Sequence, residues 1–417
     1  MAASDRAPII RLPLFGWCIV ALVVLGPWGV LAWVLRPAET PSPLPEKLAA
    51  IKVTSTPPLP IKRGPWGQLE STRIMIEPPE EFIPTELGDL QPCWVFRGYS
   101  DAKLDALWAE AGLTAEQRKS LADSARRDRP EPDTLVIRPD PELILGLSTA
   151  ARAKIYVTLA EFPENGPQRE PFRFRADMVD EWFAGSKVAP ATITLTRQLL
   201  YPRHISVYFS DHQVVLDRLP VSERTTYLKT LSRKSALLVK VRVQAEADVD
   251  ELARYWGRGR RAKDVRPLLQ SLLSQPGGGV IDLVHLLPHF PRGLLYTYPL
   301  PSERTKDGTH DCHWTSLNFY NDEPDERFTD IDFVKKKLVE DYYPVQGEPA
   351  LGDIVVFLQP GGVVVHSCVY VADNIVFTKN GPSYAVPWLL SELNNVIAFY
   401  SLGSQPLEIR RYRPKGL

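Results

Sequence analysis

Two patterns of hydrophobic positions mark the two ends of the chain. Near the N-terminus, the 22 residues from Leu14 to Leu35 contain no charged side chain. A helix of that length crosses the roughly 30 Å hydrocarbon layer of a membrane. Near the C-terminus, β-branched runs separated by turn residues predict antiparallel strands. In the run 363–371, period-two alternation predicts one face with Val364, His366, Cys368 and Tyr370 and the other with Val363, Val365, Ser367, Val369 and Val371.

The N-terminal apolar run predicts a membrane anchor that stays attached. It lacks the small-residue cleavage pattern of a signal peptide, and Trp17 precedes Cys18 where a lipoprotein signal needs a small residue. Basic residues slightly favour a cytoplasmic N-terminus. We therefore expect residues 1–36 to be a single-pass signal anchor in the cell membrane, with membrane lipid as its partner and the bulk of the chain outside the cytoplasm.

Two further segments precede the C-terminal one. Residues 37–93 contain twelve prolines, which favour extended chain and predict a Pro-rich spacer. The alternative is a loop region wrapped on the next domain, because Trp66, Ile74 and Ile76 could pack. Residues 94–279 mix helical patterns, including a capping box at Thr114–Gln117, with short β-rich runs, so an α+β domain is predicted there without an assigned role.

Composition removes several classes of function. The formal net charge is −1 and the pI is near 6.7, so nucleic acid is not an expected partner. The glycines at 277–279 lack the Lys and Ser/Thr of a phosphate loop, and no cofactor is predicted. Four cysteines do not make a disulfide framework, although a bridge between Cys93 and Cys368 stays open.

Candidate chemistry gathers in residues 280–417. Gly308 and Asp311 predict a break and a helix cap directly before Cys312, which places the thiol in the first helical turn, where the helix dipole favours a thiolate. His366 lies among valines on a predicted strand, and a buried imidazole needs a polar partner. Asn380, in the turn after the next strand, could reach back to it. The order of nucleophile, base and orienting group suits covalent catalysis.

A zinc site is the alternative use of these residues. Soft and borderline ligands are available in His310, Cys312, His313 and His366. Adjacent residues 312 and 313 point in different directions on a helix, which makes joint ligation awkward. No metal is therefore predicted.

The motifs in this last third resemble the NlpC-like family of papain-fold cysteine peptidases, which cut short peptides of bacterial peptidoglycan. The matching features are Asp311-Cys312 at a helix start, Gly352-Asp353 opening a strand, and His366 through Tyr370 on the next strand. The resemblance implies Cys312 as nucleophile, His366 as general base and Asn380 as the third residue, although strict spacing puts the third residue nearer Thr378. It also implies a tyrosine upstream of the cysteine that lines the site, which Tyr298 or Tyr296 would supply. Asp311 and His313 are expected to complete the substrate-binding surface with Tyr298.

The expected fold class is α+β. It comprises an N-terminal transmembrane helix, the spacer, the mixed α+β middle domain and a C-terminal papain-like domain at 280–417 whose helix-borne cysteine packs on an antiparallel sheet. The expected function is a membrane-anchored cell-envelope cysteine hydrolase with a peptidoglycan peptide as substrate. The alternatives are a papain-fold amidase or acyltransferase on another substrate, and an inactive envelope scaffold.

Overall fold

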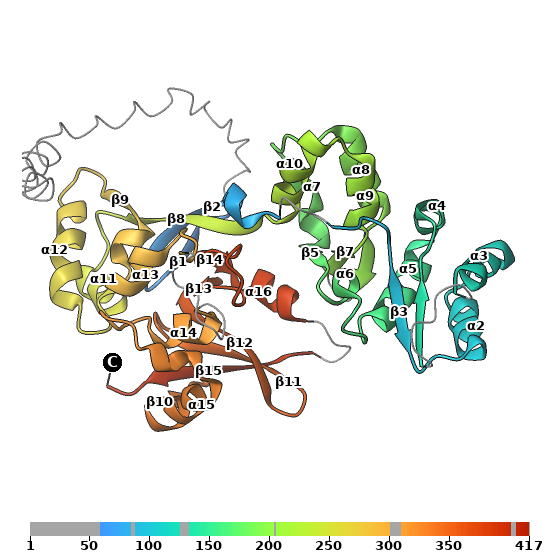
Figure 1. Cartoon of the computed structure of the whole chain (residues 1–417). Helices are drawn as coiled ribbons and strands as arrows, with labels where there is room; N and C mark the ends of the chain where they lie inside the picture. Colours follow the sequence, from blue (N-terminus) through green and yellow to red (C-terminus); the bar gives the residue numbers. More distant parts are fainter. Residues whose placement is uncertain are drawn as a thin grey trace, which may run out of the picture. The chain divides into compact units, whose positions relative to one another are not determined.

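The chain folds as a mixed α+β protein with antiparallel sheets, as predicted (Figure 1). The computed structural model describes residues 59–84, 88–125, 133–203, 206–300, 310–401 and 406–416. Within those ranges no helix has the length and apolar composition needed to cross a bilayer. The predicted anchor at Leu14–Leu35 lies outside the described residues.

Residues 94–233 alternate helices with two small sheets around one hydrophobic core. Trp94, Trp108 and Tyr156 are among its fully buried side chains. The predicted capping box is confirmed: Gln117 N donates to Thr114 Oγ1 and Thr114 N donates to Gln117 Oε1. The elements are β3 (Trp94–Arg97), α2 (Asp101–Glu110), α3 (Ala115–Ala125), β4 (Thr134–Ile137), α4 (Pro141–Leu145), α5 (Thr149–Leu159), α6 (Gly166–Arg169), β5 (Phe172–Arg175), α7 (Val179–Phe183), α8 (Pro190–Gln198), β6 (Tyr201–Arg203), β7 (Ser206–Phe209), α9 (His212–Arg218) and α10 (Val221–Leu231).

A four-stranded sheet draws part of the predicted spacer into the folded protein. Residues 67–76 form strand β2, which pairs through residues 68–76 with residues 234–242. The reason is local, because no proline lies between Pro65 and Pro78 and the segment alternates its side chains as a strand does. The sheet order is β1-β2-β8-β9, and its elements and following helices are β1 (Lys62–Gly64), β2 (Gly67–Ile76), β8 (Lys234–Val243), α11 (Val249–Trp256), α12 (Ala262–Leu273), β9 (Gly279–Asp282) and α13 (His289–Leu294).

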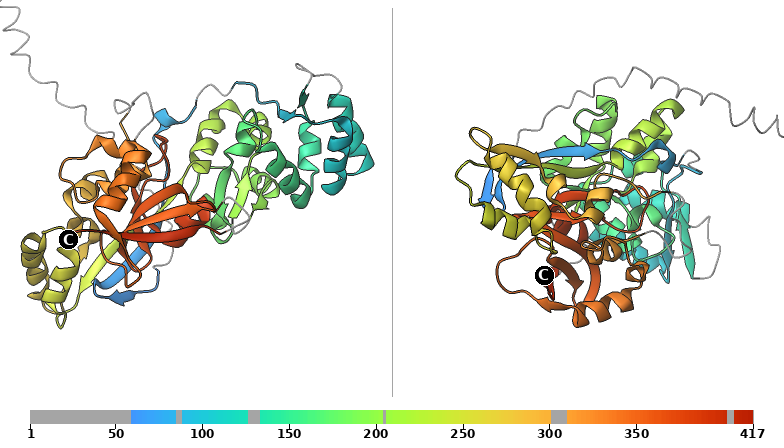
Figure 2. Two further views of the ribbon diagram at one scale, coloured as in Figure 1. Left: turned by 90° about the horizontal axis from the view of Figure 1, so that it is seen from below. Right: turned by 90° about the vertical axis from the view of Figure 1, so that its left-hand side faces the viewer.

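The C-terminal region is built on a six-stranded antiparallel sheet in the order β10-β15-β11-β12-β13-β14. Helix α14 packs against β12 and β13, and α16 contributes Val396 to a cluster on the other face (Figures 1 and 2). The elements are α14 (Cys312–Leu317), α15 (Ile331–Glu340), β10 (Tyr342–Pro344), β11 (Ile354–Gln359), β12 (Val363–Ala372), β13 (Ile375–Thr378), β14 (Leu389–Glu392), α16 (Leu393–Tyr400) and β15 (Glu408–Pro414).

One core joins this sheet to the four-stranded one. Leu69 of β2, Val241 of β8, Trp314 of α14 and Val369 of β12 belong to the same buried cluster. The predicted domain boundary between residues 279 and 280 therefore falls within a continuous hydrophobic core, and residues 67–76 share that core with the C-terminal sheet.

The predicted alternation along β12 is correct from His366 to Val371 and wrong before it. Cys368 and Tyr370 lie in one cluster, and Val369 and Val371 in the other. A bulge lies where the partners of β11 jump from Phe357↔His366 to Leu358↔Val364, so the extra residue at 365 shifts the pattern by one. Accordingly, Val364 packs with Val369, and Val365 packs with Cys368.

The Gly352-Asp353 pair ties the C-terminal strand to the start of β11. Gly352 has φ +88°, and a Cβ atom there would lie 2.2 Å from the Tyr320 hydroxyl, so only glycine fits. The Asp353 side chain is fully buried and binds Arg413 of β15 through two contacts of 2.7 Å. It also accepts a hydrogen bond from Ala350 N at 2.8 Å. The motif is therefore a structural clamp.

This clamp predicts a large stability effect. Arg413→Ala is expected to lower the free energy of unfolding by about 3 kcal/mol, because it leaves a buried carboxylate without its counter-charge. Arg410→Ala on the same strand is the matched control, since its ion pair with Glu408 is half exposed and should contribute much less to stability. Chemical denaturation followed by tryptophan fluorescence measures both. Equal losses would contradict the clamp.

Candidate active site

Asp311 and Cys312 form the start of helix α14. The Asp311 carboxylate accepts hydrogen bonds from His313 N at 2.8 Å and Trp314 N at 2.9 Å, so the predicted cap is present. Cys312 is the first helical residue and is 5% exposed. Asp311, predicted to bind substrate, thus has its Oδ1 occupied by the helix.

Ser367 fastens this helix to strand β12. Its hydroxyl lies 2.8 Å from His313 Nδ1, 3.1 Å from Ser316 Oγ and 3.3 Å from the Cys312 carbonyl oxygen. The fold thereby brings the first residue of α14 against the strand position that follows His366. His313, also predicted to bind substrate, is buried and serves this contact.

The His366 ring has a hydrogen-bond partner on the neighbouring strand β13. Its Nε2 lies 3.1 Å from Thr378 Oγ1, and Thr378 Oγ1 donates to Asn380 Oδ1 at 3.0 Å. Because the threonine hydroxyl has one proton and gives it to Asn380, it accepts from His366 Nε2–H. This chain fixes the tautomer and leaves Nδ1 as a buried acceptor without a hydrogen-bond partner among the described residues.

Thr378, and not the predicted Asn380, therefore contacts the imidazole directly. Asn380 reaches the imidazole only through Thr378, which is the residue that touches Nε2. This is the position that strict family spacing indicated. Asn380 could not replace it directly, because Asn380 lies in the turn beyond the last residue of β13.

Burial keeps both halves of the candidate pair neutral. Burial, and after it the Asp311 charge, raises the pKa of the Cys312 thiol to about 12, while the nearby N–H groups of Ser367 and Cys312 act in the opposite direction. Burial lowers the pKa of His366 well below its usual value. Desolvation therefore opposes the thiolate that the helix dipole was expected to favour. No hydrogen bond joins the Cys312 thiol to the His366 ring among the described contacts.

Aromatic rings enclose the imidazole. Tyr400 stacks on the His366 ring with 4.1 Å between centroids, and Phe357 meets it edge-on at 5.2 Å. The Tyr400 pKa is raised by burial and then by the Cys312 and Cys368 thiols, which places these groups in one electrostatic neighbourhood. Cys368 itself is a free buried thiol, so the disulfide with Cys93 is not formed.

Lys379 is a member of this neighbourhood that sequence reasoning missed. Its fully buried ammonium donates to Gly381 O at 2.7 Å and to Ser383 O at 3.1 Å. Burial lowers its pKa to about 8, against the opposing effect of Cys312 and Asp311. In the sequence it stands in Lys-Asn-Gly, a pattern typical of an exposed turn. Only the burial of this turn in the folded protein marks the lysine as unusual.

Tyr298 stands apart from the pair. Its ring contacts Phe82 at 5.9 Å between centroids, and its hydroxyl is buried without a partner among the described residues. Burial raises its pKa above the usual range for tyrosine. No contact in the described part of the chain joins Tyr298 to Cys312 or His366, so its predicted place in the substrate site stays a prediction.

Three side chains could bind a metal. One ligand atom each from Asp311, Cys312 and His313 lies within 4.8 Å of the others. The expectation that adjacent residues diverge is therefore wrong for these atoms, because His313 turns back toward Ser367. The other zinc candidates are engaged elsewhere, His366 with Thr378 and His310 with Glu326 at 2.8 Å.

Comparison of the chain with protein-family models, with curated proteins and with solved structures gives no match. The chemistry of this site must therefore be argued from its own residues.

The neutral thiol predicts a steep pH dependence of alkylation. At pH values below the pKa near 12, the thiolate fraction of Cys312 rises about tenfold per pH unit, and iodoacetamide labelling between pH 7 and 9 should rise equally. Peptide mass spectrometry separates Cys312 from the other cysteines, and Cys312→Ala confirms the assignment. A rate that is level from pH 6 to pH 8 would instead indicate a preformed thiolate–imidazolium pair.

Proposed function

We propose that this protein is a membrane-anchored cysteine hydrolase of the cell envelope, which cleaves amide bonds in peptidoglycan peptides. The single observation that supports it best is the hydrogen-bonded chain from Asn380 through Thr378 to His366 Nε2, which leaves Nδ1 without a partner among the described residues. The next residue of the same strand, Ser367, contacts the Cys312 carbonyl oxygen. The papain-like order of cysteine helix, Gly-Asp strand and histidine strand supports the same class.

The proposed reaction has balanced proton transfers. His366 Nδ1 takes the proton from Cys312 Sγ, and the thiolate attacks the amide carbonyl carbon. The C–N bond then breaks, and the imidazolium returns its proton to the departing amine. Water hydrolyses the thioester, with His366 accepting and returning a proton, and so regenerates the thiol.

Nearby positive groups would stabilise the charge that develops. The backbone N–H groups of Cys312 and Ser367 favour negative charge at the thiol, and the Lys379 ammonium acts in the same direction. Because the resting pair is neutral, ionisation must accompany substrate binding. A buried thiol with a high resting pKa could act as a nucleophile in this way.

Activity on wall fragments tests the proposal. Purified full-length protein in detergent should release new amino groups from peptidoglycan peptides, and Cys312→Ala should lower the rate at least about a thousandfold, as removal of a covalent nucleophile does. Thermal unfolding of the variant checks that it is folded. Activity confined to small amides or acylated lipids would favour the amidase or acyltransferase, and absence of activity on every substrate would favour the scaffold.

The contact to Thr378 makes a second prediction. Thr378→Val should lower kcat about fivefold to tenfold, because it removes one hydrogen bond that fixes the imidazole tautomer. Thr378→Ser should restore it, since the hydroxyl returns. Asn380→Ala should cost less than Thr378→Val, because Asn380 reaches the ring only through the hydroxyl. The reverse order would make Asn380 the direct partner in the active state.

The cluster of Asp311, Cys312 and His313 supports metal binding as a second candidate function. Cobalt(II) titration distinguishes it, because thiolate ligation to cobalt produces a near-ultraviolet charge-transfer band. A band lost in both Cys312→Ser and His313→Ala, together with hydrolysis abolished by chelators, would favour the metal site. Hydrolysis that survives chelators would favour the cysteine mechanism.

A further inference from the structure

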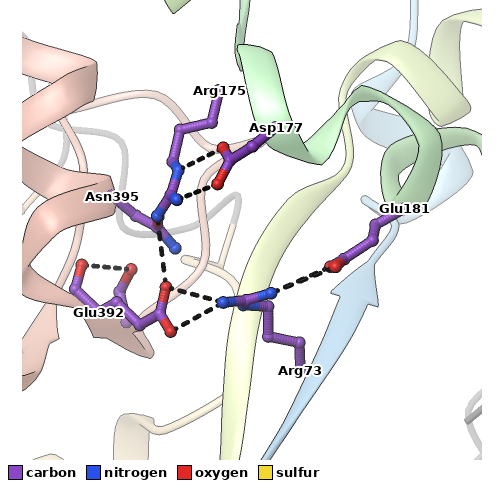
Figure 3. A network of polar contacts seen from close by, with 7 residues as sticks. Arg73, Arg175, Asp177, Glu181, Glu392 and Asn395 are labelled. Carbon is purple, nitrogen blue, oxygen red and sulfur yellow. Dashed lines mark hydrogen bonds and ion pairs between the residues drawn. The ribbon is translucent and has the colours of Figure 1, made fainter. Parts of the chain in front are cut away.

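A cavity of about 420 Å³ lies beside the candidate active site. Strand β5, the start of β8, the segment after β13 and helix α16 all contribute to its lining. Its volume is within the usual range for small-molecule sites. Figure 3 shows one border of this region, where Arg175 and Asn395 meet.

Two cations in this lining have no carboxylate partner. The Lys234 ammonium has neither a hydrogen bond nor an ion pair with any described residue. The Arg173 guanidinium donates to the Phe399 carbonyl oxygen at 3.2 Å, and Glu170 acts on it only by longer-range attraction. Burial and Arg173 lower the pKa of Lys234 to about 8, so it is still charged at neutral pH. The acidic side chain of the lining, Glu170, is exposed and makes no ion pair with either cation.

The contrast with Arg175 shows that these cations are unusual. Arg175 also lines the cavity, but it is paired with Asp177 and lies 3.4 Å from Glu392 (Figure 3). Arg73 completes that network through Glu392 at 3.0 Å and Glu181 at 3.2 Å. Lys234 and Arg173 are half-buried. A cation partly removed from water without such a partner is unfavourable, which an anionic ligand would relieve.

The remaining lining combines serines and asparagines with an apolar and aromatic portion. That portion includes Phe172, Phe174, Met178, Trp182 and Phe399. The Arg173 guanidinium lies 5.0 Å from the centre of the Phe399 ring, which aligns charge and aromatic surface at one place. A ligand that matches both features carries an anionic group on an apolar or aromatic body.

The cavity is one side chain away from the proposed base. Tyr400 lines it and stacks on the His366 ring, and Asn380 lines it and accepts from Thr378. A ligand held by Lys234 and Arg173 would therefore contact the groups that surround the imidazole.

We propose that this cavity binds the carboxylate of a peptide-like ligand, with Lys234 and Arg173 as the anion-binding residues and the aromatic lining as the pocket for an adjoining apolar side chain. Carboxylate binding stands on the cavity alone. The identification of that ligand as the substrate of Cys312 rests on the proposed function.

Calorimetric titration of the full chain tests the binding. N-acetyl-phenylalanine is expected to bind at least tenfold more tightly than its uncharged amide, and Lys234→Met should abolish that preference. Lys240→Met is the matched control, because Lys240 is exposed on the same strand and should leave both affinities unchanged. Arg173→Gln provides a second variant, and near-ultraviolet circular dichroism checks that each variant is folded.

Three outcomes overturn the proposal: equal affinity for the acid and the amide, no binding of either, or a preference that survives Lys234→Met. Inorganic phosphate that binds as tightly as the acid would overturn the assignment to a carboxylate on an apolar body. Cys312→Ala separates this proposal from the hydrolase. Acid binding retained by a protein without hydrolytic activity would leave the cavity assignment intact and remove the enzyme, whereas hydrolysis without acid preference would do the reverse.

Discussion

The contact between Ser367 and the start of helix α14 is the constraint on which the candidate site depends. One hydroxyl meets the His313 ring, the Ser316 hydroxyl and the Cys312 carbonyl oxygen in a buried setting. Buried polar groups are costly unless paired, so this cluster has few alternative arrangements. Because Ser367 follows His366 directly, the contact that holds the helix against the strand also brings Cys312 to the strand residue next to the imidazole.

That placement has an electrostatic consequence. The helix start supplies N–H groups and the Lys379 ammonium supplies positive charge, yet burial and the capping carboxylate of Asp311 leave the thiol neutral. In a site of this kind the ionised thiolate–imidazolium pair would form only during the reaction. Displacement of Tyr400 from the His366 ring, with which it stacks, is one change that would open the imidazole to a substrate. The free energy needed to ionise the thiol would then come from substrate binding and not from the resting protein.

The sequence predicts the positions of individual site residues better than the contacts between them. Asp311 as a cap and Cys312 in the first turn follow from local chemistry, and the structure has both. The strand β2 was hidden by neighbouring prolines, and its pairing with β8 joins residues far apart in the chain. The bulge at residue 365 and the use of Thr378 instead of Asn380 depend on how neighbouring strands pair. Lys379 looked like a turn residue because its burial comes from tertiary packing.

The segment before residues 280–417 contributes to the cavity beside the candidate site. Arg173 of β5 lines the same cavity as Tyr400 of α16, and Arg173 donates to the carbonyl oxygen of Phe399, the neighbour of Tyr400. Phe174, which follows Arg173 on β5, belongs to the hydrophobic core of residues 94–233, whereas Tyr400 packs against the small cluster that contains Cys368. Tyr400 contacts both environments, since it faces the cavity and stacks on His366. A ligand in the cavity would therefore contact the ring that covers His366.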